Sequence, residues 1–256
     1  MIVPGLVSVT FRQLGVPEVV RLTAAAGLEA IEWGGDVHVP AGDLAAAETA
    51  RELTAAAGLT VAAYGSYYRA GHSDPADLDP VVRTAAALGA PLIRVWAGML
   101  GSAEATPAQR ACTVQALRRA GEAAAGHGMR IALEYHRNTL TDTLASATAL
   151  FAEVDRAEVV PYWQPAGGQP GAVALTEVRA LLPELVTTHV FSWGPGGGKD
   201  RLPLAERADL WQPVLAELAA DGRDRFALVE FVPEDSPAIF LRDAATLRDW
   251  LTHPLG

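Results

Sequence analysis

The feature that most constrains this chain is a repeat near its start. Alanine-rich segments end at Gly27, Gly58 and Gly89, which are 31 positions apart (58−27 and 89−58), and a short apolar segment follows each glycine. Glycine suits the left-handed position just after a helix. We therefore interpret each unit as a helix end, a glycine cap and a strand. A fourth unit, with its cap at Gly126, continues the pattern. Such alternation predicts a parallel sheet with helical crossovers.

The same alternation continues to the end of the chain. We expect strands near residues 6–11, 30–33, 60–64, 92–96, 130–135, 159–163, 186–191 and 226–231. We expect helices near residues 17–26, 44–57, 80–88, 107–127, 141–154, 175–182, 204–220 and 237–251. Eight strand–helix units predict the α/β class and a (β/α)8 TIM barrel, as one domain spanning residues 1–256, because about 250 residues are typical of that barrel. An open doubly wound sheet is the alternative, but residues 11–15 lack the dinucleotide fingerprint that it would carry after its first strand.

Charge and cysteine content limit the compartment and the partners. The net charge of −10 disfavours non-specific binding to nucleic acid. The single cysteine, Cys112, excludes an intrachain disulfide and a cysteine-based zinc site, and it fits a reducing compartment. The first residues lack the pattern of a signal peptide, and no uninterrupted apolar run approaches the about 18 residues of a membrane span. We expect a cytoplasmic protein with no nucleic-acid or membrane partner.

Polar residues stand at the ends of the last four predicted strands, where barrels of this kind carry their active sites. Glu134 and His136 end the fifth strand on one side, Gln164 ends the sixth, His189 lies in the seventh and Glu230 ends the eighth. A single polar residue at a strand end is usually a loop anchor. Two carboxylates that converge at an apolar barrel mouth repel each other, however, and a divalent cation would hold both ionised. Mixed oxygen and nitrogen ligands suit Mn²⁺, Mg²⁺, Co²⁺ or Zn²⁺ without choosing among them.

These residues give the chain a specific resemblance. Along essentially its whole length it resembles the xylose isomerase-like TIM-barrel superfamily, the sugar phosphate isomerase/epimerase group. The resemblance is strongest at residues 31–36, at residues 133–136, at His189 and at Glu230. It implies one divalent metal bound by four residues, two of which, Glu134 and Glu230, also form a proton-transferring catalytic pair. The implied metal ligands are Glu134, Gln164, His189 and Glu230.

The chain departs from the family pattern on the sixth strand. Gln164 stands where Asp is usual, and Gly167 stands where a histidine is usual. A glutamine carbonyl still coordinates a hard cation, although without charge. The site either keeps its metal in a neutral cage or has lost it. We expect the metal to be kept because the other three ligands are present.

Other side chains near the strand ends are candidates for contact with a polyhydroxylated substrate. Aromatic faces stack on sugar C–H surfaces, and guanidinium groups bind hydroxyls or carboxylates. The candidate substrate-binding residues are His38, Tyr64, Arg94, Trp96, His136 and Lys199. In the alternative interpretation, the tyrosines cover the barrel top and Arg94 pairs with a neighbouring acid. The glycine-rich segment 194–200 predicts a mobile surface loop that could close as a lid, and Thr139 or Thr141 is expected to cap a helix.

Three functions follow from this pattern. The leading hypothesis is a metal-dependent isomerase or epimerase of a sugar or sugar derivative in carbohydrate metabolism, in which Glu134 and Glu230 move a proton α to a carbonyl. The second is a metal-dependent dehydratase or lyase, which expels a β-leaving group from the same enolate of a keto-sugar or glycoside derivative. The third is a non-catalytic sugar-binding barrel that has lost its metal. The expected partner is a small-molecule carbohydrate, and a homo-oligomer is compatible with the sequence.

Overall fold

The computed structural model of the protein describes residues 1–253, and its main sheet is a closed barrel. The strands follow one another in the order β1-β10-β7-β6-β5-β4-β3-β2. The pairs β1–β10, β1–β2, β10–β7, β3–β4, β4–β5 and β5–β6 are all parallel. Parallel neighbours need crossover connections, which the helices between the strands supply. The predicted (β/α)8 TIM barrel is therefore confirmed.

The elements lie close to where the sequence predicts them. The barrel strands are β1 (Ile2–Val7), β2 (Ala30–Gly34), β3 (Thr60–Ala70), β4 (Leu92–Ala97), β5 (Arg130–Glu134), β6 (Val159–Trp163), β7 (Thr187–Val190) and β10 (Arg225–Val229). The helices are α1 (Val16–Ala25), α2 (Leu44–Ala56), α3 (Leu78–Leu88), α4 (Pro107–Ala125), α5 (Leu144–Val154), α6 (Gly171–Leu181), α7 (Ala208–Ala220) and α8 (Pro237–Thr252). Short 3-10 helices are η1 (Ser8–Phe11), η2 (Pro75–Asp77), η3 (Gly197–Lys199), η4 (Leu204–Arg207) and η5 (Pro233–Asp235).

Two predictions about strands need correction. The first strand ends at Val7, and the apolar residues after it form η1. An apolar residue stands at position 11 because Phe11 packs edge-on against Phe240 of α8, with ring centroids 5.4 Å apart, although Phe11 lies outside any strand. The sequence also gave no sign of the hairpin made by β8 (Ser192–Trp193) and β9 (Arg201–Leu202), whose two-residue strands are too short to show a period.

The glycine caps are confirmed at three of the four predicted positions. Gly27, Gly58 and Gly89 have φ values of 66°, 73° and 73°. Gly126, in contrast, has φ −57° and continues the right-handed path of α4, and the left-handed residue is Gly128, with φ 72°. The left-handed turn thus lies two residues further along than predicted, although α4 itself ends at Ala125.

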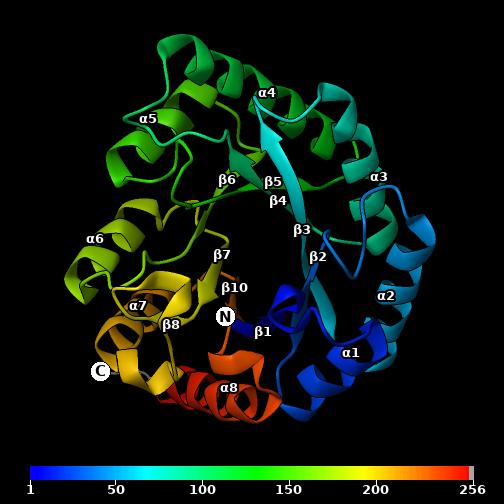
Figure 1. Cartoon of the computed structure of the whole chain (residues 1–256), viewed down its shortest axis with the longest axis vertical. Helices are drawn as coiled ribbons and strands as arrows, with labels where there is room; N and C mark the ends of the chain where they lie inside the picture. Colours follow the sequence, from blue (N-terminus) through cyan, green and yellow to red (C-terminus); the bar gives the residue numbers. More distant parts are fainter. Residues whose placement is uncertain (254–256) are drawn as a thin grey trace. The chain divides into compact units, whose positions relative to one another are not determined.

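The described chain divides into two compact units. The first contains Met1–Glu32, Leu53–Thr60 and the residues from Trp163 onward; the second contains Trp33–Glu52 and Val61–Tyr162. Within the first unit α6 lies beside α7 (Figure 1). Within the second, α4 packs on α5 and on β5 (Figure 1). A single domain over residues 1–256 stays a prediction, and residues 254–256 of that range lie outside the described residues.

No helix in the described part of the chain combines the length and the apolar character that crossing a membrane requires.

Candidate functional site

In the first unit, a histidine of β7 is surrounded by polar side chains from other strands. His189 is fully buried. Its Nδ1 atom lies 3.1 Å from Oε1 of Gln164 and 3.4 Å from Oε2 of Glu230. Its Nε2 atom lies 3.5 Å from Oε2 of Glu32, which ends no strand but lies within β2 and is fully buried. Three of the four predicted metal ligands therefore lie together, and Glu32 is a member of the cluster that we had not included among the site residues.

The hydrogen-bonding capacity of these groups shows what the cluster can hold. An amide oxygen only accepts hydrogen bonds, so Nδ1 of His189 carries a proton and donates it to Oε1 of Gln164 at 3.1 Å. Carboxylate oxygens of Glu230 and Glu32 lie beside the two ring nitrogens, 3.4 Å from Nδ1 and 3.5 Å from Nε2 respectively. One carboxylate, one amide oxygen and one imidazole are mixed oxygen and nitrogen donors of the kind that divalent cations bind, and a carboxylate near the far nitrogen of a histidine is common at such sites. The residues present thus fit a divalent cation.

The remaining predicted ligand stands in the second unit. Glu134 ends β5, and its Oε2 atom lies 2.5 Å from Nη1 of Arg94 on β4; only 4% and 3% of the two side chains are exposed. The hydroxyl of Ser66 donates to the backbone carbonyl of Arg94 at 2.6 Å. Arg94 therefore pairs with a neighbouring acid, as the alternative interpretation of the sequence predicted. Such a pair keeps the carboxylate of Glu134 charged, as a metal ligand must be.

An indole ring on β4 collects several of the predicted residues. The guanidinium carbons of Arg69 and Arg94 lie 4.3 Å and 5.2 Å from the ring centroid of Trp96. The rings of Tyr67 and His136 lie 5.3 Å and 5.5 Å from the same ring. The structure thus brings three candidate substrate-binding residues together, namely Arg94, Trp96 and His136. Arg69, which was not among the candidate substrate-binding residues, also lies at this ring, because β3 extends to Ala70, beyond the predicted end of the strand.

The backbone around the end of β5 is held by two threonines. The hydroxyl of Thr141 donates to the carbonyl of Glu134, and that of Thr139 donates to the carbonyl of His136, each at 2.6 Å. The Nδ1 atom of His136 lies 2.6 Å from the carbonyl oxygen of Arg137. A carbonyl only accepts, so Nδ1 carries the proton and the lone pair of the neutral ring is on Nε2. His136 is half-buried and is thus oriented as a proton acceptor.

The expected helix cap lies elsewhere. Helix α5 begins at Leu144, and its cap is Thr143, whose hydroxyl accepts from the backbone N–H of Ser146. The prediction that Thr139 or Thr141 caps the helix was wrong, because both lie before the first turn and bond to the carbonyls of His136 and Glu134 instead.

The other predicted substrate-binding residues have varied surroundings. The buried hydroxyl of Tyr64 donates to the carbonyl of Val39 at 2.9 Å, and burial, with a smaller effect of Asp36, raises the pKa of Tyr64 above its usual value. We therefore assign Tyr64 to holding the loop after β2. His38, in that loop, is 6% exposed and meets the ring of Trp33 edge-on at 5.8 Å. Lys199 is exposed on η3, in the first unit.

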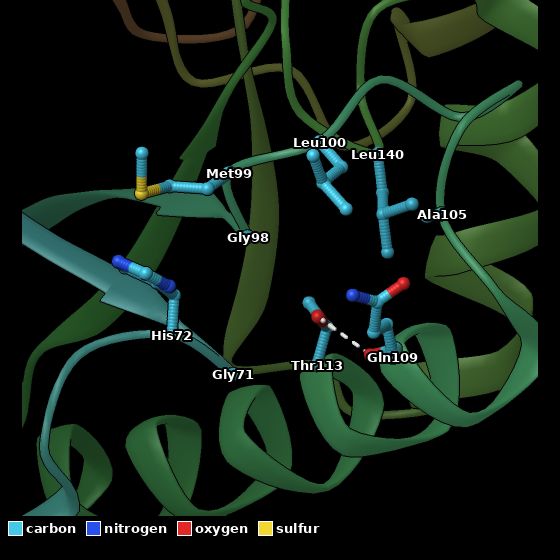
Figure 2. Close-up of a pocket in the computed structure, with 9 residues that line it drawn as sticks. All are labelled: Gly71, His72, Gly98, Met99, Leu100, Ala105, Gln109, Thr113 and Leu140. Atoms are coloured by element: carbon cyan, nitrogen blue, oxygen red, sulfur yellow. Dashed lines mark hydrogen bonds between the residues drawn. The ribbon is translucent and has the colours of Figure 1, made fainter.

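A cavity of about 90 Å³ lies where β3 and β4 end and α4 begins (Figure 2). Figure 2 shows its lining, which consists of Gly71, His72, Gly98, Met99, Leu100, Ala105, Gln109, Thr113 and Leu140. Most of these residues are apolar or lack a side chain, and none is a predicted catalytic or metal-binding residue. The carbonyl of Gly98 accepts from Nη1 of Arg69, so the cavity adjoins the residues around Trp96.

Fold and strand-end residues together define a class of protein. The xylose isomerase-like TIM-barrel family matches residues 20–250, and the chain belongs to that family. A 3-dehydroshikimate dehydratase from Bacillus anthracis is 46% identical over 63 residues. That match spans 25% of this chain and only 22% of the length of the dehydratase.

Solved structures share the fold over nearly the whole chain. The probable 3-DHS dehydratase of petrobactin synthesis from Bacillus anthracis has a TM-score of 0.81 at 21% identity, covering 97% of this chain and 99% of that one. D-allulose 3-epimerase from Methylomonas sp. has a TM-score of 0.71 at 16% identity, covering 99% and 98%. A xylose isomerase-like TIM-barrel protein from Mycobacterium smegmatis, solved in complex with magnesium, has a TM-score of 0.71 at 16% identity, covering 100% and 98%. At these identities the likeness establishes the fold.

Proposed function

We propose that this protein is a metal-dependent dehydratase that removes water from a polyhydroxylated keto compound. The observation that carries the proposal is the division of roles at the end of β5. Glu134 is buried in an ion pair with Arg94. His136, two residues further along, donates the proton on Nδ1 in a hydrogen bond to the carbonyl of Arg137, which leaves the lone pair of Nε2 to accept a proton. The stretch of 46% identity to a 3-dehydroshikimate dehydratase supports the same reaction.

In this mechanism His136 is the general base. Its Nε2 atom removes a proton from the carbon α to the substrate carbonyl, as a histidine placed near the reacting carbon can do at neutral pH. The electron pair left on that carbon forms a C=C bond while the β C–O bond breaks. The proton held by His136 then passes to the departing hydroxyl. The products are an enone and water, and His136 returns to its neutral form.

In this proposal Gln164, His189 and Glu230, which lie together in the first unit, would hold the cation. Glu134 stays the fourth predicted ligand, as the family resemblance implies. A bound divalent ion polarises the substrate carbonyl and so acidifies the neighbouring C–H. Two carboxylates, one amide and one imidazole balance a 2+ charge, which suits Mn²⁺, Mg²⁺, Co²⁺ or Zn²⁺. Arg94 keeps Glu134 ionised and in place, and Glu32 orients His189.

Epimerisation or isomerisation of a sugar by Glu134 and Glu230 is the second candidate, because the family resemblance implies that pair. It requires Glu134 to accept and release a proton. A buried carboxylate that is ion-paired with a guanidinium resists protonation, since the neutral acid would leave Arg94 buried without an anion. We therefore rank epimerisation or isomerisation below dehydration as the function of this protein.

One set of reactions separates these functions. The purified protein, loaded with Mn²⁺ or Mg²⁺, is incubated in D₂O with 3-dehydroshikimate and, separately, with D-fructose. Dehydration is seen as a product lighter by one water; from 3-dehydroshikimate it is an aromatic acid with strong ultraviolet absorbance. A deuterated sugar isomer without loss of water would overturn the dehydratase in favour of an epimerase. No conversion of either compound with any of the four metals would favour the non-catalytic sugar-binding barrel.

A further inference from the structure

Two guanidinium groups face one indole ring in the second unit, and only one of them has an acid beside it. Arg94 pairs with Glu134 at 2.5 Å. Arg69, whose guanidinium carbon is 4.3 Å from the Trp96 ring centroid, has no carboxylate oxygen within 4.0 Å among residues 1–253. Its Nη1 atom donates instead to the neutral carbonyl of Gly98 at 3.2 Å. The three charges around the ring therefore sum to one positive charge.

That extra charge lies in a partly dehydrated place. Arg69 is half-buried, and burial lowers the pKa of its guanidinium, against the opposing effect of Glu134. Charged groups that are taken out of water are normally paired or hydrogen-bonded to an opposite charge. Within the described chain the guanidinium group of Arg69 contacts only the carbonyl of Gly98 and the face of the indole ring. Its other N–H groups can therefore donate to a ligand.

A second group points to a ligand independently of the charge. Only 9% of Trp96 is exposed, and its Nε1–H has no hydrogen-bond acceptor in the part of the chain that the structure describes. Buried polar groups in proteins nearly always have a partner, and one that lacks it marks the place of a bound water, ion or ligand. An oxygen atom of a ligand would satisfy this donor.

We infer that Arg69 and Trp96 form a subsite for the carboxylate of the substrate. A carboxylate accepts from a guanidinium through two parallel hydrogen bonds, which gives both affinity and orientation. The substrate is therefore an anionic, polyhydroxylated keto acid rather than a neutral sugar. The inference rests on the proposed function for the reaction, but the subsite binds an anion whether or not the reaction follows.

Binding is tested with compounds that the proposed reaction cannot consume. Shikimate carries the ring carboxylate and hydroxyls but no ketone, and its methyl ester lacks only the charge. Both are titrated against the wild type, Arg69→Met and Arg69→Lys, followed by tryptophan fluorescence and by calorimetry. Arg83→Met is the matched control, since Arg83 is an exposed arginine of α3 that pairs with Asp79. Thermal melts of each variant show whether it is folded.

The wild type and Arg83→Met are expected to bind shikimate at least 10-fold more tightly than its ester. Arg69→Met is expected to lose that preference. Arg69→Lys is expected to keep part of it, because lysine keeps the positive charge but lacks the two parallel N–H donors of a guanidinium group. Trp96→Phe is expected to weaken binding of the acid while the protein stays folded. Equal binding of acid and ester by the wild type, or an undiminished preference in folded Arg69→Met, would overturn the subsite. Tighter Arg69-dependent binding of inorganic phosphate than of shikimate would also overturn it.

The two proposals fail separately. An Arg69-dependent preference for the acid without dehydration of 3-dehydroshikimate contradicts the proposed function and leaves the subsite standing. If Arg69→Met dehydrates 3-dehydroshikimate as efficiently as the wild type, the subsite is contradicted and the proposed function stands.

Discussion

Arg94 and Glu134 form an ion pair with an Nη1–Oε2 distance of 2.5 Å, and at most 4% of either side chain is exposed. Removing one partner of a buried pair strands the other charge, so we expect Arg94→Met to lower the free energy of unfolding by about 3–5 kcal/mol. The double variant with Glu134→Leu should recover part of that loss. Urea unfolding in EDTA measures both. The control is the pair Arg179–Glu217, whose side chains are 60% and 27% exposed, and breaking it should cost about 0–1 kcal/mol. Equal effects at the two pairs would contradict this assignment.

His136 is expected to control the chemical step. His136→Asn should lower kcat for dehydration by about 10²–10⁴-fold, the usual contribution of a general base, with little change in unfolding or metal affinity. Steady-state kinetics with the metal-loaded protein measures this. The control is His72→Asn, an exposed histidine in the loop after β3. If His136→Asn kept the kcat of the wild type, another group would have to be the base.

Glu32 is expected to tune the proposed metal ligand His189. The carboxylate of Glu32 lies 3.5 Å from Nε2 of His189 and would favour a proton on that nitrogen once Nδ1 binds a metal. Glu32→Gln should weaken Mn²⁺ binding by about 10–100-fold, because the amide neither carries charge nor selects the tautomer. Chelator competition measures the affinity. Glu29→Gln, at an exposed position just before β2, is the matched control. Unchanged affinity in Glu32→Gln would remove Glu32 from the site.

Asp243 makes stability depend on pH in an unusual direction. Burial raises the pKa of Asp243 from 3.8 to about 6, although its hydrogen bond from the backbone N–H of Leu204 and the charge of Arg242 oppose the shift. Between these pH values the folded protein holds a proton that the unfolded chain has released. The contribution of Asp243 to the free energy of unfolding is therefore fully present below the unfolded pKa of 3.8, and it is lost as pH rises through the folded value of about 6. The loss amounts to at most about 3 kcal/mol.

Asp243→Asn tests that linkage. The amide oxygen can still accept from Leu204, but the side chain no longer ionises. We expect the variant to be more stable than the wild type at pH 8, by about 1–3 kcal/mol, and equally stable near pH 4. Urea unfolding across this range gives the difference, with exposed Asp77→Asn as control. A variant that is less stable at pH 8, or a difference that does not change with pH, would refute the linkage.

Sequence reasoning located the fold and the strand-end residues more reliably than their partners. The 31-residue repeat predicted the barrel because helix, glycine cap and strand are local patterns. Gln164, His189 and Glu230 were found together because alternation and strand position place residues at the same end of a parallel barrel. Glu32 was not predicted as a site residue because it lies inside β2, whereas the candidate ligands stand near the ends of the later strands. Its signal was present, as a single acid within an otherwise apolar strand.

What this sequence determined by itself is the order and type of its elements and its family, since these follow from periodic burial and short-range backbone chemistry. The tertiary structure decided how the charges pair. Arg94 and Glu134 are 40 positions apart, and Glu32 meets His189 across a still longer span. Such contacts depend on strand register and on side-chain conformations selected by close packing, which no local pattern encodes. For that reason a glutamate that the sequence presented as a proton carrier is held in an ion pair by the structure, and His136 beside it is oriented by the carbonyl of Arg137.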